Sequence, residues 1–560
     1  MRSERALRTW LAPAAIGLGG LVLFYREFLF SGFDLVAGER GDARFITFIH
    51  ENAYQSLIGR STFLSPPMYF PAQGTLSYSD AFLLDALVYV PARWLGADPF
   101  LAGEITYAAL SLIGFALLTW LLVGYARVRP WLAGCAGFVF AYSNALFVGG
   151  NHAQLRAVEL TPLVVILLLQ AVRDSGRQGR RAVICAGCGG LLAGLMFATG
   201  YYVAWFQLLL LCLAAPLAGW LVAGRRIITG FASAGGAPTA IGFAAGFVAG
   251  VIPFFVIYWP FLRSPHSFAF FSYVGCAPTL ADYLNVGPGN LVWGPVEAQA
   301  GIASTSLLAL ETSLAVTPTV LAGFILSAIA IGRGARLTEP SERGVRAVSL
   351  AVFVAVGLLY LLVVRGSGHS LFWFAWLTIP GAGAIRCAAR FQVLANGCAV
   401  AVAAIVLDRA MTGWAGTWKR WALLAAMILA MAEQVNLSSS SQVSRAAENA
   451  VLDPVPPPPE GCRAFYVAER PGAPDDVLDE SFQQIDAMLL AERLGVPTLN
   501  GYSAWAPEGW TMGHIHDPAY EPGALAWAAR NGIADSVCRV DIPTGTWSRP
   551  ARSSAAMPIQ

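Results

Sequence analysis

Charged residues are scarce in this chain of 560 residues: Asp, Glu, Lys and Arg together make up 12% of it. An ordinary soluble domain is about a quarter charged. Hydrophobic residues supply 56% of the chain, and the mean hydropathy is +0.58. This composition excludes a soluble enzyme over most of the length, and it excludes a disordered chain. The sequence is therefore that of a polytopic membrane protein.

The chain has almost no lysine, and its cysteines show no metal-binding pattern. Lys419 is the only lysine, so nearly every cation is an arginine. Arginine presents a rigid donor fork that suits phosphate, although high-GC codon usage explains the same bias. Cys185 and Cys188 form a C-x-x-C inside an apolar run, with no second pair or histidine nearby. We interpret them as packing residues and not as metal ligands.

Long apolar runs are what the chain has in abundance. A span takes about 20 mainly apolar residues, with a range of about 17–25. Eleven candidate runs are Trp10–Phe30, Phe100–Gly124, Trp131–Gly149, Val158–Val172, Ala182–Thr199, Tyr201–Ala223, Thr239–Pro260, Ala315–Gly332, Ala347–Val364, Phe391–Leu407 and Trp421–Val435. The sequence predicts a mainly α-helical protein with about 11 transmembrane helices.

Basic residues predict the orientation of these runs. Arg2, Arg5 and Arg8 precede the first run, and cytoplasmic loops collect Lys and Arg. With the N-terminus inside, every short loop that must be cytoplasmic is basic, holding Arg127/Arg129, Arg173/Arg177/Arg180/Arg181, Arg225/Arg226, Arg333/Arg336/Arg343/Arg346 and Arg409/Lys419/Arg420. An extra span upstream would invert this alternation. The short apolar piece Ala81–Leu95 is therefore predicted to be interfacial or re-entrant.

The same topology predicts the domain organisation. Residues 1–435 form a transmembrane domain, with a large first extracytoplasmic loop at 31–99 and a second at 261–310. A linker at 436–462, which includes the run Pro456–Pro459, leads to a small extracytoplasmic α/β domain at 463–560. Its expected strands are Arg463–Glu469 and Ser536–Ile542, and its expected helices are Ser481–Leu494 and Gly523–Asn531. From Asn436 onward there are 8 Arg, no Lys and 15 acids, which argues against nucleic acid as a partner.

Four cysteines fall on the predicted outer side. Cys462 and Cys538 flank the tail domain and make a plausible disulfide if that domain is extracytoplasmic. Cys276 and Cys387 lie in outer loops, so more than one pairing is open.

The beginning of the first outer loop, Phe33–Phe45, carries five charged residues beside the membrane surface. Asp42 follows Gly41 and starts an expected interfacial helix, Ala43–Ile58, with Arg44 two residues on. The apolar face expected to lie on the bilayer consists of Phe45, Phe48, Ile49 and Leu57. Asp42 is either a functional carboxylate facing a cavity or merely the cap of that helix. Farther along, Pro67-Met68-Tyr69-Phe70-Pro71 and Ser77-Tyr78-Ser79-Asp80 form a proline-stiffened aromatic stretch. It suits a substrate ledge or an interfacial aromatic belt.

Two further polar clusters lie at predicted outer ends of spans. The turn with His152, Gln154 and Glu159 is dense in polar groups, and Glu159 falls just inside an apolar run. An ionisable group there needs water or a partner, and an internal pair with Arg156 is the simpler account. Arg386 and Arg390 are four apart, so a helix would place them on one face. Two cations on the side disfavoured for positive charge suggest an anion such as a lipid phosphate, with a salt bridge to an acidic loop as the alternative.

Taken in order, these residues carry a resemblance. It rests on Gly41-Asp42, Tyr69-Phe70-Pro71, Ser77-Tyr78-Ser79-Asp80, His152 with Gln154, Asp282-Tyr283-Leu284, Trp293-Gly294-Pro295, Pro380-Gly381 with Arg386 and Arg390, and, in the tail, Asn500-Gly501-Tyr502-Ser503 and Pro507-Glu508-Gly509-Trp510. The chain resembles a mostly uncharacterised group of bacterial GT-C-type integral membrane glycosyltransferases over nearly its whole length.

The resemblance implies an enzyme of the bacterial inner membrane that moves a sugar from a polyprenyl-phosphate donor on the outer face. It implies Asp42 as the catalytic base, with Arg386, Arg390 and Arg44 binding phosphate and with His152, Gln154, Glu159 and Asp80 in support. A single displacement would invert the anomeric carbon. Gly41-Asp42 departs from the acidic pair that many such enzymes carry, so a divalent metal, Mg²⁺ or Mn²⁺ on Asp42 and His152, stays open. The acceptor is a lipid-linked glycan, a polysaccharide or a protein.

Two other classes of function fit parts of the sequence. A lipid or polysaccharide transporter or flippase would also have many spans and an outer anion site. Transporters, however, usually place ionisable groups or Gly/Pro breaks at mid-membrane in matching halves, and no halves are visible. A noncatalytic envelope assembly protein would use the aromatic tail, with Tyr502, Trp505 and Trp510, to bind a partner.

Overall fold

The computed structural model describes residues 2–175, 179–224, 236–263, 269–301, 311–333, 342–411, 417–470 and 477–550. The chain is mainly helical and divides into two compact units. The first comprises Met1–Leu29, Tyr107–Phe255 and Pro265–Ser440, and the second comprises Phe30–Thr106, Val256–Ser264 and Ser441–Gln560. Parts of the predicted outer loop 261–310 and the end of the tail lie outside the described residues. So do Arg177, Arg225, Arg226 and Arg336 of the predicted cytoplasmic loops.

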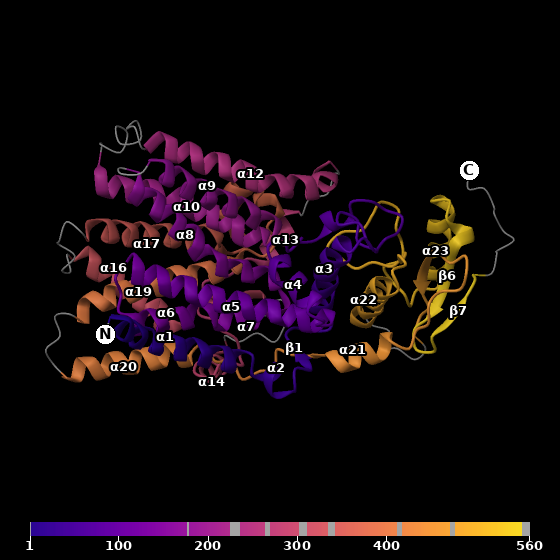
Figure 1. Ribbon diagram of the computed structural model, residues 1–560, viewed down its shortest axis with the longest axis horizontal. Coiled ribbons are helices and arrows are strands. Elements are labelled where there is room, and N and C mark those ends of the chain that lie inside the picture. Colours follow the sequence, from indigo (N-terminus) through magenta and orange to yellow (C-terminus); the bar gives the residue numbers. More distant parts are fainter. Residues whose placement is uncertain are drawn as a thin grey trace. The chain divides into compact units, whose positions relative to one another are not determined.

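The first unit is a bundle of long helices joined by short ones. Its helices are α1 (Arg2–Phe24), α2 (Arg26–Phe30), α5 (Pro99–Gly124), α6 (Pro130–Ala141), α7 (Asn144–Val148), α8 (Thr161–Asp174), α9 (Gly179–Leu195), α10 (Tyr201–Ala223), α12 (Gly236–Leu262), α13 (Phe270–Cys276), α14 (Gly294–Ala300), α16 (Pro318–Gly332), α17 (Arg343–Val363), α18 (Phe372–Thr378), α19 (Gln392–Met411) and α20 (Thr417–Ala432). The last residue of α2, residues 99–106 of α5 and residues 256–262 of α12 belong to the second unit. Its 3₁₀ turns are η2 (Gly149–Asn151), η3 (Ala153–Leu160), η4 (Met196–Ala198), η5 (Ala281–Tyr283), η6 (Ala382–Ala384) and η7 (Ala388–Phe391), and its strands are β2 (Arg365–Gly366) and β3 (His369–Ser370). Helix α8 lies along α9, α10 along α17, and α16 along α19 (Figure 1).

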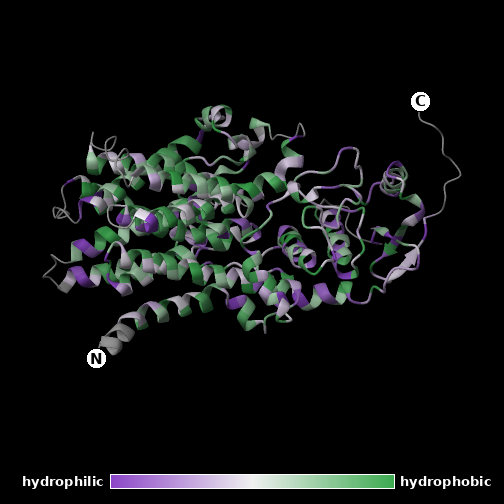
Figure 2. Cartoon of the chain, turned by 45° about the horizontal axis from the view of Figure 1, so that its top comes forward, coloured by the Kyte–Doolittle hydropathy of each residue, from purple (hydrophilic) through white to green (hydrophobic). Residues whose placement is uncertain are grey.

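Eight stretches in the described part of the chain are long and apolar enough to cross a membrane. They are Pro99–Gly124, Pro130–Asn151, Ala153–Asp174, Gly179–Ala198, Tyr201–Ala223, Gly236–Leu262, Arg343–Val363 and Ala388–Met411. Thr9–Phe24 and Pro318–Gly332 are shorter apolar helices, and the run predicted at Trp421–Val435 overlaps α20. In Figure 2 the helices of this unit are largely green, for hydrophobic. The chain is thus a multi-pass membrane protein, and the count of eleven stays a prediction.

Glycines let two of these helices approach closely. Along α9, Gly187, Gly190 and Gly194 face α12, where Gly246 and Gly250 recur at four-residue spacing. A Cβ atom at Gly246 would collide with the backbone of Gly187, and one at Gly250 with the backbone of Leu191. Small residues at four-residue spacing are the usual solution for helix packing inside a bilayer, where close backbone approach supplies the attraction.

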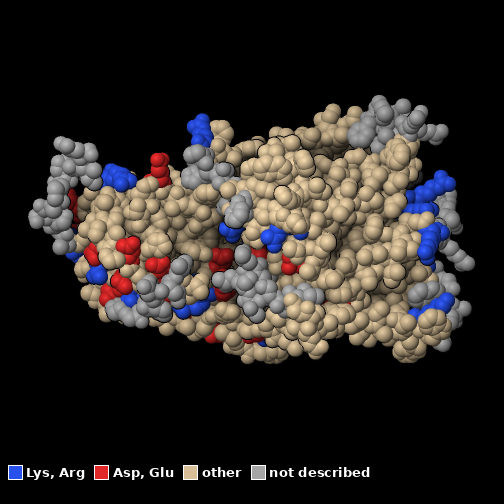
Figure 3. Space-filling view, turned by 180° about the vertical axis from the view of Figure 1, so that it is seen from behind, with Lys and Arg blue, Asp and Glu red and all other residues tan. Residues whose placement is uncertain are grey.

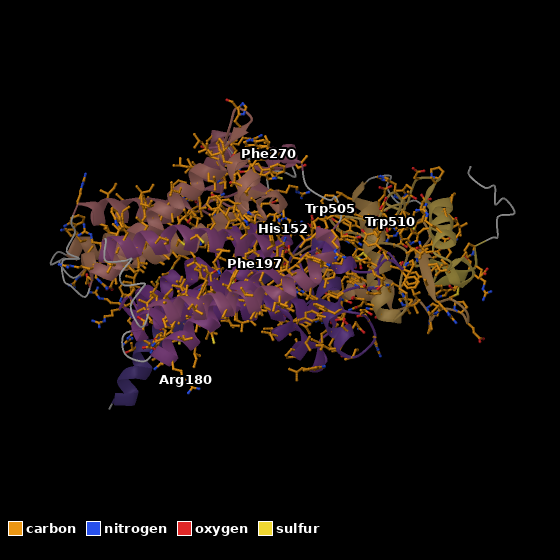
Figure 4. All side chains as sticks on the ribbon, turned by 90° about the horizontal axis from the view of Figure 1, so that it is seen from above. His152, Arg180, Phe197, Phe270, Trp505 and Trp510 are labelled. Carbon is orange, nitrogen blue, oxygen red and sulfur yellow. A yellow bond between two sulfur atoms is a disulfide. The ribbon has the colours of Figure 1, made fainter. Side chains whose placement is uncertain are left out.

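Basic residues gather at one end of the helical bundle, while the surface along its length is nearly all uncharged (Figure 3). Arg180 and Arg181, at the start of α9, belong to the predicted cytoplasmic loops. Figure 4 places Arg180 at one end of the bundle and His152 at the other. Such a grouping of basic residues is typical of the cytoplasmic end of a membrane bundle, and the orientation itself stays a prediction.

The second unit mixes helices with short strands. It holds β1 (Leu35–Val36), α3 (Asp42–Leu57), η1 (Thr75–Tyr78), α4 (Ala86–Trp94), β4 (Val443–Ser444), α21 (Arg445–Leu452), β5 (Ala464–Val467), α22 (Val477–Leu494), α23 (Tyr520–Arg530), η8 (Ala534–Ser536), β6 (Val537–Asp541) and β7 (Thr546–Ser548). Strand β5 pairs with β6 in parallel, with Ala464 opposite Val537, and β6 pairs with β7 antiparallel (Figure 1). The predicted disulfide Cys462–Cys538 is confirmed at the start of β5 and β6.

Much of the first outer loop belongs to this second unit. Strand β1 pairs antiparallel with β4, Leu35 opposite Ser444. Helix α3 begins at the predicted place, but it does not lie with an apolar face open to a bilayer. Of the four residues expected on the bilayer, Phe45, Phe48 and Ile49 are buried, because α3 packs against α22 and α4, and only Leu57 at its end is exposed. The predicted division at residue 435 stays a prediction, and the loop and the tail share one hydrophobic core within this unit.

Candidate active site

Asp42, the predicted base, is the first residue of α3 and is half-buried. It does not cap the helix, because the N-cap residue is Gly41 and no side-chain cap hydrogen bond is present there. Instead, the Tyr502 hydroxyl of the tail donates a hydrogen bond of 2.9 Å to Asp42 Oδ1. The ring of Tyr502 meets that of Phe45 edge-on, with centroids 5.5 Å apart. Burial, and then the neighbouring Asp42 carboxylate, raises the pKa of Tyr502, so the hydroxyl keeps its proton as the donor.

Arg44, predicted to bind phosphate, is fully buried and held between two carboxylates. Its Nε lies 2.7 Å from Glu448 Oε2 on α21, and its Nη2 pairs with Asp486 on α22. Burial alone would lower the pKa of Arg44, but Asp486 and Glu448 outweigh it, so that its pKa is raised. In this arrangement Arg44 fastens the start of α3 to the tail, and both of its partners come from elements distant in the sequence.

The proline-stiffened stretch runs against the tail. Backbone hydrogen bonds join Thr498 N to Pro67 O at 3.0 Å and Tyr69 N to Asn500 O at 2.9 Å. Tyr69 is buried, and its ring meets that of Trp510 edge-on at 4.9 Å. Asp80, just beyond η1, is half-buried. The stretch is therefore a packed part of the second unit and not an exposed belt.

In the first unit, His152 and Arg390 both contact the carboxylate of Glu311, which the sequence did not indicate as a site residue. Arg390 Nη2 lies 2.6 Å from Glu311 Oε1, and His152 Nε2 lies 2.9 Å from the same oxygen. Arg390 also lies over the ring of Tyr202, at 5.2 Å from its centroid. Burial alone would raise the pKa of Glu311, but Arg390 and His152 outweigh it and hold that pKa well below its usual range. Glu311 is therefore an ionised partner that neutralises the buried arginine.

Arg386 is exposed, in contrast to Arg390, and the two do not share a helix face. The glycines at 381 and 383 follow Pro380, and Gly381 has a φ of +81°, so the chain forms the turn η6 instead of a helix. The backbone N–H of Arg386 donates to Tyr202 Oη at 2.8 Å. Cys276 and the neighbouring Cys387 are buried free thiols.

Glu159 and Gln154 belong to the interior of the same unit. Glu159 is fully buried, its Oε1 lies 3.5 Å from Arg156 Nη1, and it accepts a hydrogen bond of 3.1 Å from Ser111. The internal pair expected as the simpler account is thus confirmed. Gln154 is half-buried on the turn η3, two residues after His152.

The residues that the structure describes do not assemble a metal site. Among them, no group of three or more His, Cys, Asp or Glu side chains is placed to hold a metal ion. Asp42 belongs to the second unit and His152 to the first. A site for Mg²⁺ or Mn²⁺ stays a prediction.

Sequence reasoning missed the roles of Glu311 and of the Tyr502 hydroxyl. Glu311 stands one residue beyond the predicted loop 261–310 and four before the next apolar run, so an acid at the predicted outer mouth of a span was the available signal. Tyr502 was recognised only as part of a motif, because 460 residues separate it from Asp42.

Comparisons with known proteins complete the description. No protein-family model matches the chain, and no curated protein matches it. The chain is similar to the cryo-EM structure of the arabinofuranosyltransferase AftD from Mycobacteria, with a TM-score of 0.48 and 14% identity over 82% of this chain and 29% of that one. It is also similar to the crystal structure of the Archaeoglobus fulgidus oligosaccharyltransferase with zinc and sulfate, with a TM-score of 0.46 and 12% identity over 94% and 68%. The chain spans less than a third of the length of AftD.

Proposed function

We propose that this chain is an inverting membrane glycosyltransferase that moves a sugar from a polyprenyl-phosphate donor to an acceptor hydroxyl on the extracytoplasmic side. The observation that carries the proposal is the carboxylate of Asp42. It stands in the position that the sequence resemblance gives to the base, it is half-buried, and a tyrosine hydroxyl holds it. The proposal includes eleven spans, a cytoplasmic N-terminus and a tail on the outer face of a bacterial inner membrane.

The reaction needs one proton acceptor and one stabiliser of charge. An acceptor hydroxyl gives its proton to Asp42 while its oxygen forms the new bond to the anomeric carbon. The bond from that carbon to the phosphate oxygen breaks, and the electron pair leaves on polyprenyl phosphate. Attack from the side opposite the leaving group inverts the anomeric carbon.

The leaving phosphate gains negative charge, and Arg386 is the cation proposed to stabilise it. Arg386 is exposed in the predicted outer segment, whereas Arg390 is buried against Glu311 and Arg44 is buried against Glu448 and Asp486. Arg390 is therefore assigned a structural role, in which its ion pair with Glu311 stabilises the segment that carries Arg386. His152 shares this role because it contacts the same Glu311. Asp80, Gln154 and Glu159 are assigned no chemical step.

The test uses the full chain in nanodiscs with a panel of short-chain polyprenyl-phosphate sugars, and it measures release of free polyprenyl phosphate. Asp42→Asn is expected to abolish release from the donor that the wild type uses. Arg386→Ala is expected to lower the rate about a hundredfold, the usual effect of losing one charge-stabilising donor. Glu508→Gln and Arg343→Ala remove exposed charges elsewhere and are the matched controls, expected to keep the wild-type rate.

Retention of wild-type release by a folded Asp42→Asn variant would overturn the assignment of the base. Absence of release from every donor, with donor binding intact, would instead favour a carrier or flippase, or an assembly protein. Deleting the tail is not a clean test of the assembly alternative, because β4, α21 and α22 hold the start of α3 within one unit.

A further inference from the structure

Backbone hydrogen bonds join the tail at residues 498 and 500 to residues 67–70 of the first outer loop. Thr498 N donates to Pro67 O at 3.0 Å, Tyr69 N to Asn500 O at 2.9 Å, and Phe70 N to Thr498 O at 3.0 Å. Trp527 Nε1 on α23 also donates to Phe70 O, at 2.8 Å. Together these four hydrogen bonds hold the tail segment against residues 67–70 of the loop.

Buried polar bonds fix the same segment from the other side. Asn500 is fully buried, and its amide donates to Gln484 Oε1 and to Tyr520 Oη, each at 2.8 Å. Gly501 passes so close to Tyr69 that a Cβ atom there would collide with the ring. A segment held by buried, satisfied hydrogen bonds and by close backbone approach has little freedom to move.

Tyr502 follows directly and reaches the start of α3. Its backbone N–H contacts Met488 Sδ at 3.2 Å, its ring packs edge-on against Phe45, and its hydroxyl donates to Asp42 Oδ1 at 2.9 Å. The ring has two rotatable bonds and both are restricted by these contacts. The hydroxyl is therefore aimed at one carboxylate oxygen by the tail itself.

We propose that Tyr502 is the positioning residue for Asp42, so that the tail forms part of the catalytic unit and is not merely an acceptor-binding appendage. This inference rests on the proposed function. A hydrogen bond from a fixed donor to one carboxylate oxygen sets the rotation of the carboxylate. The second oxygen is thereby oriented to receive the proton of the acceptor hydroxyl, and a misplaced base loses rate steeply.

The test compares Tyr502→Phe with the wild type in the nanodisc assay, at saturating and limiting donor. Phenylalanine keeps the ring against Phe45 and removes only the hydroxyl. We expect kcat to fall about tenfold to a hundredfold, which is the range for losing a hydrogen bond to a charged group, while KM for the donor changes less than about twofold. Tyr502→His, which keeps a ring donor, is expected to recover part of kcat.

Tyr466→Phe is the matched control. Tyr466 is buried in the same unit and donates a hydrogen bond of 2.8 Å to the carboxylate of Glu521, so this variant loses a bond of the same kind away from Asp42. Its kcat per folded molecule is expected to equal that of the wild type.

Several results would overturn the inference. One is a wild-type kcat in Tyr502→Phe. Another is an equal fall in Tyr502→Phe and Tyr466→Phe that follows the loss of folded protein in gel filtration, which would make the bond structural only. If Tyr502→Phe aggregates, Tyr502→His is compared with Tyr502→Ala instead. Equal kcat values in these two variants would contradict the positioning role. Failure of the proposed function is a separate result, since the wild type itself would then release no polyprenyl phosphate.

Discussion

Replacing Arg44 with methionine tests whether this arginine is a structural clamp or a phosphate ligand. Its side chain is fully buried, with Glu448 Oε2 at 2.7 Å and Asp486 as its second partner. Methionine fills much of the same volume but leaves two buried carboxylates without their shared cation. Removing one partner of a buried ion pair destabilises a protein by about 3–5 kcal/mol, because the remaining charge is poorly solvated.

The surrounding charges place the expected loss at the lower end of that range. Asp486 keeps Arg470, whose Nη2 lies 2.7 Å from its Oδ2, and Glu448 keeps Arg40 at 3.6 Å. We therefore expect a loss of about 3 kcal/mol, or a fall in Tm of about 6–12 °C for a unit of this size. Arg40 contacts the same Glu448 but its side chain is 43% exposed, so Arg40→Met is expected to lose less than about 1 kcal/mol.

Thermal unfolding in detergent, followed by intrinsic fluorescence, measures both variants side by side. The refuting result is an Arg44→Met variant whose Tm lies within about 1 °C of the wild type. If that variant instead kept its Tm and showed a raised KM for a polyprenyl-phosphate donor, Arg44 would be a phosphate ligand, as the sequence resemblance implies. Equal losses in Arg44→Met and Arg40→Met would show that burial does not control the effect.

Two further predictions concern the same unit. Burial, reinforced by Glu51, raises the pKa of Glu492 well above its usual value despite Arg93, so the folded state holds a proton there and loses stability as pH rises above about 4.3 toward that raised pKa. The Tm of Glu492→Gln minus the Tm of the wild type is expected to increase as the pH is raised from about 5 to about 8. The same Tm difference at both ends of that range would contradict this prediction. Replacing Cys462 and Cys538 with serine opens a loop with a sequence separation of 76 and is expected to remove up to about 4 kcal/mol. Denaturant unfolding with and without a reductant checks this, and a wild type insensitive to the reductant would refute it.

Local patterns predicted the secondary structure well in this chain. The run Tyr201–Ala223 is helix α10 with the same bounds, and the helix expected at Ala43–Ile58 is α3, Asp42–Leu57. In the tail, the expected strand Ser536–Ile542 contains β6, Val537–Asp541. These elements follow from hydrophobic periodicity and from the residues that begin and end each element, both of which are local properties.

Where local patterns misled, long-range packing was the cause. Phe45, Phe48 and Ile49 have the spacing of a membrane-facing stripe, yet all three are buried. An apolar stripe on a helix predicts that this face is buried, but it does not predict whether lipid or protein buries it. The prediction that Arg386 and Arg390 share one helix face was wrong for a different reason. Pro380 and Gly381 turn the chain, so that no helix forms there.

The sequence by itself determined that this is a multi-pass membrane protein with basic residues at one end of its bundle, because composition, run length and charge placement act without reference to distant residues. It also indicated Asp42, Arg386, Arg390 and His152 as candidate site residues. Only the tertiary structure decided their partners. Asp42 meets Tyr502 across 460 residues, and Arg390 meets Glu311 across 79. Such pairs are set by how elements pack, since burying a charge is favourable only when folding delivers a counter-charge or a donor to it.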